Sequence, residues 1–168
     1  MFGLISIDLF VITLFLGLLG LAVVSDIESL RIPNRISLAI AALYPVHVLA
    51  GSGTVDWPGA VAVAAGVFAL GLVAFAVGAV GGGDVKLMAA TALWAGPAMV
   101  LDFVLATTAV GGGVALAMLT RWRFVLARFF EGVGGEDIRD VLLGRAVPYA
   151  VAIAAGAYLT IGPRLLGG

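Results

Sequence analysis

The sequence predicts an all-α polytopic membrane protein with about six transmembrane helices, an outside amino terminus and short loops. Of its 168 residues, 62% are hydrophobic and only 11% are charged, with a mean hydropathy of +1.20. Its charge-free runs reach about 20 residues, the length of helix that crosses a bilayer. Because no stretch is long enough for a soluble domain, we expect residues 1–168 to form a single transmembrane domain.

The first half of the chain divides into three apolar spans separated by polar turns. The first, residues 4–24, ends at the polar stretch 25–31, and Pro33 and Asn34 then mark a turn. The next two predicted spans are residues 36–50 and 60–80.

The apolar run over residues 87–120 is too long for one span. A single helix of that length would be about 51 Å long, against a hydrocarbon core of about 30 Å. We predict a break at Gly96-Pro97, because proline removes a backbone donor and disfavours helix in the residue before it. A polar segment, 121–145, follows, with an amphipathic surface helix around 124–130. Pro148 opens a last span that ends near Ile161.

Basic residues orient these spans, because cytoplasmic loops collect lysine and arginine. With the amino terminus outside, every basic residue except Arg164 falls on the inner side. Aromatic residues that favour the membrane interface agree with this orientation: Trp57 and Trp94 at the outer boundary, Trp122 and Tyr149 at the inner one. The inner basic residues are Arg31, Arg35, Lys86, Arg121, Arg123, Arg128, Arg139 and Arg145.

Composition also excludes several kinds of chemistry. The chain has no cysteine and one histidine, which excludes thiolate nucleophiles and iron–sulfur clusters and argues against a zinc or multi-histidine site. Its net charge of −1 gives no polycationic surface for nucleic acid. We therefore expect no metal, no cofactor and no nucleic-acid partner, and a lipid bilayer as the surroundings.

Two aspartates fall at the same depth on the inner side. Asp26 lies at the end of the first span, and Asp84 lies where the third span joins the fourth. Two carboxylates held close share one proton, so that the neutral group can polarise a carbonyl while the ionised group activates water. Hydrolysis of a peptide bond without metal, serine or cysteine needs these two roles. Each residue also has a plainer interpretation, Asp84 as a helix N-cap and Asp26 as a polar helix end.

The neighbours of Asp84 add to this hypothesis. Gly81 and Gly83 permit backbone conformations closed to other residues and allow a substrate strand or helix to approach. Lys86 would stabilise the ionised pair or bind substrate, or would simply extend its ammonium group to the inner interface.

Residues 26–34, Asp-Ile-Glu-Ser-Leu-Arg-Ile-Pro-Asn, resemble the D-x5-I-P-N pattern of the type IV prepilin peptidases. Residues 81–87, Gly-Gly-Gly-Asp-Val-Lys-Leu, resemble the G-x-G-D-x-K-L of the same family, and residues 147–150, Val-Pro-Tyr-Ala, its entry into the last helix. The resemblance covers essentially the whole chain and implies a single transmembrane peptidase domain.

The resemblance implies an aspartic endopeptidase of the bacterial inner membrane, with its active site facing the cytoplasm. Its substrates would be prepilin or pseudopilin precursors, from which it removes a short basic leader peptide. By the family pattern Asp26 and Asp84 are the catalytic pair and Gly81 and Gly83 the frame of the second aspartate. Pro33, Asn34 and Lys86 are the other supporting or substrate-binding candidates.

The larger family members add an amino-terminal region with a zinc-binding cysteine cluster and methylate the new amino terminus. Because this sequence contains no cysteine, it resembles the compact, peptidase-only branch associated with Flp-type (tight adherence) pili.

Two other classes of function stay open from the sequence. A small transporter or channel subunit would also carry carboxylates and broken helices within a membrane, although both key aspartates lie at helix ends. A non-catalytic subunit of a pilus-assembly machine would tolerate replacement of both aspartates.

Overall fold

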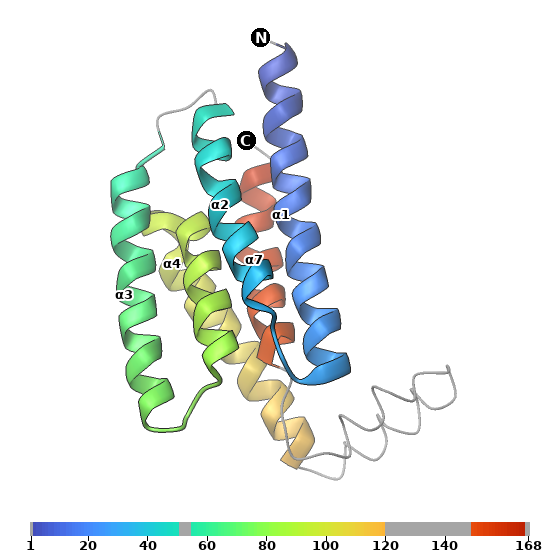
Figure 1. Ribbon diagram of the computed structural model, residues 1–168, viewed down its shortest axis with the longest axis vertical. Coiled ribbons are helices and arrows are strands. Elements are labelled where there is room, and N and C mark those ends of the chain that lie inside the picture. The colour runs from blue at the N-terminus through green and yellow to red at the C-terminus, as the bar shows by residue number, and fades with distance from the viewer. Residues whose placement is uncertain (1, 51–54, 120–148, 167–168) are drawn as a thin grey trace, which may run out of the picture.

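The computed structural model describes residues 2–50, 55–119 and 149–166, and every regular element among them is a helix (Figure 1). The helices are α1 (Phe2–Ser29), α2 (Asn34–Ala50), α3 (Trp57–Ala76), α4 (Gly82–Leu119) and α7 (Tyr149–Leu166). The predicted all-helical fold is confirmed. The expected surface helix within 121–145 lies outside the described residues.

Three helical segments are long and apolar enough to cross a membrane: Leu9–Ser29, Trp57–Ala76 and Gly82–Ala117. Two more, Asn34–Ala50 and Tyr149–Pro163, are apolar but shorter. This composition is that of a polytopic membrane protein, as the sequence predicts. The number of spans and the position of the amino terminus stay predictions.

The first helix continues past the predicted end at residue 24. The Ser29 hydroxyl donates to the Ser25 carbonyl oxygen at 2.8 Å, and the Leu30 amide donates to that of Asp26 at 2.8 Å. Leu30 then takes a left-handed conformation, with φ 51°, which is uncommon for a residue with a side chain and reverses the chain sharply. Asp26 therefore lies in the last turn of α1, directly before this reversal.

The predicted break at Gly96-Pro97 is confirmed. Gly96 has φ 58° and ψ −174°, a conformation that is essentially restricted to glycine. The break divides α4 into a first arm, residues 82–95, and a second arm, residues 97–119. The chain turns back between the two arms, and the second arm passes the start of α7, where Tyr149 packs on Gly111 (Figure 1).

The helices pack around α4, which contacts α2, α3 and α7, while α1 contacts α2 and α7. Fully buried side chains from four helices fill the centre of the bundle. The largest are Phe15, Leu19, Ile40, Leu87, Phe103, Ile153 and Ile161.

Trp94 is buried inside the bundle, so its ring is not on the surface as that of an interfacial aromatic residue would be, and its depth in the membrane stays a prediction. Its side chain is 4% exposed and stacks on Phe15 with ring centroids 4.2 Å apart. The indole Nε1 donates a hydrogen bond to the Ile40 carbonyl oxygen at 3.0 Å. Because this bond satisfies the only polar group of the ring, Trp94 can pack in the core, away from interfacial water.

Replacing Gly96 with alanine should destabilise the protein. A Cβ there would lie 3.9 Å from that of Ala60, an ordinary contact, so the cost is the backbone conformation, about 1–3 kcal/mol. Measuring the free energy of unfolding of both proteins in mixed micelles gives the size of this cost. Gly112→Ala is the matched control, because Gly112 is helical with open space around it, and alanine there should stabilise by about 0.5–1 kcal/mol. Equal effects of the two substitutions would contradict this role of Gly96.

Candidate active site

Asp26 is held by a helix from the far end of the chain. It is 6% exposed, and its Oδ2 accepts a hydrogen bond from the Ala150 backbone N–H at 2.9 Å. Ala150 is in the first turn of α7, where backbone donors have no partner within their own helix. The positive end of the helix dipole also favours a carboxylate at this position. Asp26 therefore joins the end of α1 to the start of α7.

Asp84 lies in the first turn of α4 and is half-buried. The Gly81 backbone amide donates a hydrogen bond to its carboxylate, and the Val85 amide donates to the Gly81 carbonyl oxygen at 3.1 Å. These two bonds close the first turn of the helix around Asp84. The plainer interpretation of Asp84 as the N-cap is wrong, because Asp84 is the third residue of α4 and its carboxylate accepts from the amide of Gly81, the residue before the helix. This contact at the helix start does not exclude a chemical role.

The two carboxylates line the same cavity, of about 350 Å³, at the end of the bundle where α1 ends and α4 begins. They are near enough for the charge of Asp26 to act on Asp84. The sequence places both at one depth, and the structure brings them together in one polar recess. The other lining residues are Leu30, Arg31, Ile32, Asn34, Gly81, Gly82 and Gly83.

The two sequence motifs touch beside the carboxylates. The Lys86 ammonium donates a hydrogen bond to the Asn34 side-chain oxygen at 2.9 Å. A Cβ built on Gly83 would lie 3.2 Å from the Cβ of Ile32, a tight contact that would push the two segments slightly apart. Of the supporting candidates, Asn34, Gly81 and Gly83 line the cavity, whereas Lys86 contacts it through Asn34.

The expected backbone freedom of Gly81 and Gly83 is wrong, because neither residue has a positive φ. At both positions the absence of a side chain instead leaves space for a neighbouring group. A Cβ on Gly81 would lie 2.7 Å from Asp84 Oδ2, inside contact distance. Pro33 forms the turn before α2, where its carbonyl oxygen accepts from the Ile36 amide at 3.0 Å, and it is not among the residues that line the cavity.

A second cavity, of about 240 Å³, lies against the other side of Asp84 and is otherwise almost entirely apolar. Tyr149 lines it as well, and its ring packs so closely on Gly111 that a Cβ there would lie 2.8 Å from Cε2. Asp84 therefore separates a polar recess from an apolar one. The remaining lining residues come from α3, from the turn before α4 and from both arms of α4.

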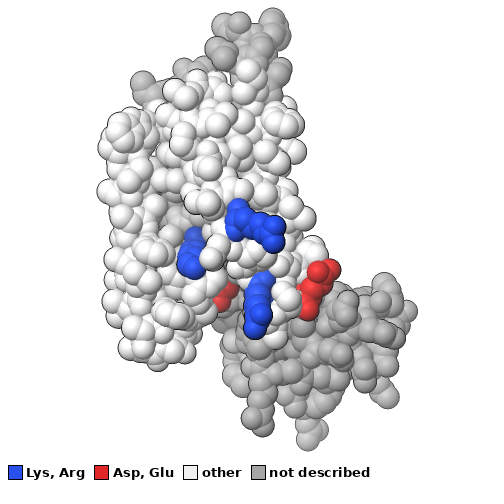
Figure 2. Space-filling view, in the orientation of Figure 1, with Lys and Arg blue, Asp and Glu red and all other residues white. Residues whose placement is uncertain are grey.

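Basic side chains surround this end of the molecule. Arg31, Arg35 and Lys86 are all exposed. The basic side chains visible in Figure 2 gather on one part of that face, with acidic groups beside them. Within the ranges that the structure describes, no group of three or more histidine and acidic side chains is placed to hold a metal ion.

Residues 13–116 match the model of the type IV leader peptidase family, a range that includes Asp26 and Asp84. The chain belongs to this family. It is also 31% identical over 156 residues to the prepilin leader peptidase/N-methyltransferase of Bacillus subtilis (strain 168). That alignment covers 92% of this chain and 56% of the relative, so the chain spans about half the length of the curated relative it matches. No solved structure matches the chain.

Ala150 is the part of the candidate site that the sequence does not predict. A backbone amide has no sequence signature, but Pro148 marks a helix start, and a helix start is a site for a carboxylate. Tyr149 was expected only as an interfacial aromatic residue, and the structure places it in the cavity beside Asp84.

Replacing Asp26 with alanine should release the start of α7. Hydrogen exchange of the Ala150 amide should become faster, because the carboxylate that accepts its hydrogen bond is gone. Asp26→Asn keeps an acceptor oxygen and should retain most of the protection. Mass spectrometry of exchanged peptides over residues 149–155 provides the measurement. Asp84→Ala is the control and should leave this amide unchanged; equal exchange in wild type and Asp26→Ala would show that the bond does not hold α7.

Proposed function

We propose that this chain is a membrane-embedded aspartic endopeptidase that removes the basic leader peptide from prepilin or pseudopilin precursors. Asp26 and Asp84 are the catalytic pair in this proposal, and the active site faces the cytoplasm from the bacterial inner membrane. One observation carries it: in a member of the type IV leader peptidase family, the two motif aspartates line one polar cavity at the end of an apolar bundle.

The surroundings of the pair suit hydrolysis of a peptide bond. The cavity is lined by polar as well as apolar groups and has room for water, while the apolar helices around it strengthen electrostatic interactions inside it. Both carboxylates accept backbone hydrogen bonds, from Ala150 and from Gly81, which fix their positions without using a side chain. The negative charge of Asp26 acts on Asp84, and in this proposal the two carboxyl groups share one proton.

In the proposed reaction a water molecule lies between the two carboxyl groups. One carboxylate takes a proton from this water as its oxygen attacks the scissile carbonyl carbon, and the other carboxyl group gives its proton to the carbonyl oxygen. The resulting tetrahedral diol collapses with transfer of a proton to the leaving nitrogen, which breaks the C–N bond. The leader leaves with a new carboxyl terminus, the mature chain has a new amino terminus, and no covalent intermediate forms.

The Bacillus subtilis relative is named for two activities, leader peptidase and N-methyltransferase. We assign only the peptidase step to Asp26 and Asp84, because two carboxylates and a water supply acid–base chemistry and no methyl donor. Placement in the Flp-type branch stays a prediction from the sequence.

Asp26→Asn and Asp84→Asn should each strongly reduce leader removal by the purified protein. Asparagine keeps the size of the side chain but neither takes up nor gives the proton, so kcat/KM should fall about 100- to 10,000-fold. The assay follows a shortened product from a precursor that carries its leader. Asp102→Asn is the matched control, since Asp102 is exposed on the second arm of α4 and lines neither cavity.

Near-normal cleavage by either active-site variant would overturn the catalytic pair. Wild-type protein that processes no precursor, yet supports pilus assembly equally well with both aspartates replaced, would favour a non-catalytic assembly subunit.

A further inference from the structure

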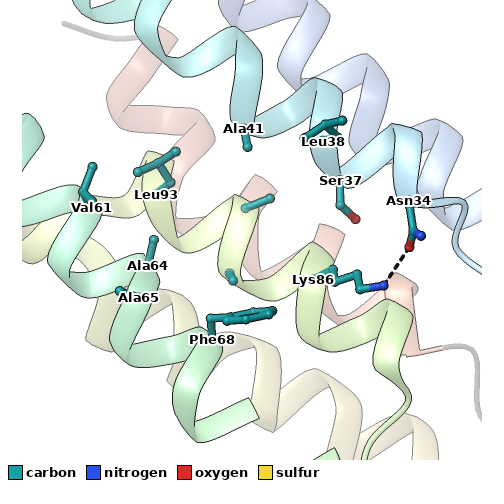
Figure 3. Close-up of a pocket in the computed structure, with 12 residues that line it drawn as sticks. Asn34, Ser37, Leu38, Ala41, Val61, Ala64, Ala65, Phe68, Lys86 and Leu93 are labelled. Carbon is teal, nitrogen blue, oxygen red and sulfur yellow. Dashed lines mark hydrogen bonds between the residues drawn. The ribbon is translucent and has the colours of Figure 1, made fainter. Parts of the chain in front are cut away.

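A groove of about 600 Å³ runs along the bundle between α2, α3 and the first arm of α4 (Figure 3). Each helix contributes residues spaced i, i+3, i+4 and i+7, which form one face of a helix. We call this surface the α2–α3 groove. Its lining residues are Asn34, Ser37, Leu38 and Ala41 of α2, Val61, Ala64, Ala65 and Phe68 of α3, and Lys86, Ala89, Ala90 and Leu93 of α4.

The groove exists because α2 and α3 both pack on α4 but are not packed extensively on each other. The lining residues of each helix run from i to i+7, so the groove is about 10 Å long. One leaflet of a bilayer has about 15 Å of hydrocarbon, so the groove covers most of the depth of one leaflet.

Polar groups occur only at one end of the α2–α3 groove. Lys86 and Asn34 lie at this end, and the charged ammonium group of Lys86 bonds the neutral Asn34 oxygen, which leaves its positive charge uncompensated by that contact. Ser37 follows one helical turn deeper, roughly 4.5 Å along α2. Beyond it, every lining residue is alanine, valine, leucine or phenylalanine.

Ser37 provides independent evidence for a ligand. It is 6% exposed, and its hydroxyl has no hydrogen-bond partner among the described residues. Figure 3 shows this side chain on the groove side of α2, above Lys86. A buried hydroxyl without a hydrogen-bond partner destabilises a protein. A ligand in the groove that offers an acceptor to Ser37 would remove this cost.

We propose that the α2–α3 groove binds one anionic phospholipid. The phosphate lies at Lys86 and the Asn34 amide, the glycerol ester oxygens accept from Ser37, and an acyl chain fills the apolar part. Along the groove a charged donor is followed by a hydroxyl donor and then by apolar side chains. A phospholipid has the matching order of phosphate, ester oxygens and acyl chain. A transmembrane helix would need no such order, because its backbone polar groups are satisfied internally. Basic pockets between membrane helices bind lipid headgroups in the same manner.

Native mass spectrometry of the whole chain tests this proposal. The protein is released from micelles after incubation with equal amounts of phosphatidylglycerol and phosphatidylcholine that carry identical acyl chains. We expect one retained phosphatidylglycerol, preferred about tenfold or more, the effect of one charge-assisted hydrogen bond. Lys86→Gln should remove this preference. Arg35→Gln removes one positive charge from the same surface but outside the groove, and should keep it.

A second pair of variants tests the apolar part. Ala64→Phe fills the groove and should lower lipid retention at least tenfold, whereas Ala62→Phe adds the same bulk at an exposed position of α3 outside the groove and should not. Thermal unfolding in detergent establishes that both variants fold. The proposal is overturned by equal retention of the two lipids, by equal losses in Lys86→Gln and Arg35→Gln, or by Ala64→Phe protein that keeps its lipid.

A groove that instead takes a substrate helix would give a different result: Ala64→Phe would keep phosphatidylglycerol and lose cross-linking to a precursor. That outcome also overturns the proposal. Lipid retention does not depend on leader cleavage, so failure of the proposed peptidase activity and failure of the lipid site are separate observations.

Discussion

The hydrogen bond between the Ala150 amide and the Asp26 carboxylate is the contact on which the candidate site depends. A carboxylate that is 6% exposed among apolar helices requires a donor, because burial of an unpaired charge is expensive. The start of α7 offers donors that its own helix cannot use. One bond thus satisfies a buried acid and positions a helix that packs on both α1 and α4. It also joins residues that are 124 positions apart in the sequence.

Around this contact, the two sequence motifs, residues 26–34 and 81–87, form a single structure. The sharp reversal at Leu30 brings the turn before α2 against the start of α4, where Gly83 leaves room for Ile32 and Lys86 bonds Asn34. The resulting recess contains both aspartates and opens at the end of the bundle. In the proposed reaction a peptide enters this recess and meets both carboxylates, whose electrostatic interaction is strengthened by the apolar helices around them.

The break in α4 determines both where its two arms pack and where space is left between the helices. The glycine-specific conformation of Gly96 folds α4 back on itself, so one helix supplies both the segment that carries Asp84 and a second arm that packs nearby. Because α2 and α3 both pack on α4, a groove is left between them. The hydrogen-bond donors of the groove lie at the same end of the bundle as the polar recess. Asn34 lines both, which makes the recess and the groove neighbours.

The sequence by itself determined the helical class, the break at Gly96, the membership of a peptidase family and the position of both aspartates at helix ends. These follow from composition, proline and glycine chemistry and local motifs, which act within a few residues. Only the tertiary structure decided that Trp94 is buried, that Ala150 holds Asp26 and that Lys86 meets Asn34. In a chain this apolar, the side of a helix that faces lipid is as hydrophobic as the side that faces its neighbours. Hydrophobic periodicity therefore cannot indicate which face packs, and long-range partners are set by shape and by the few polar groups that must find one another.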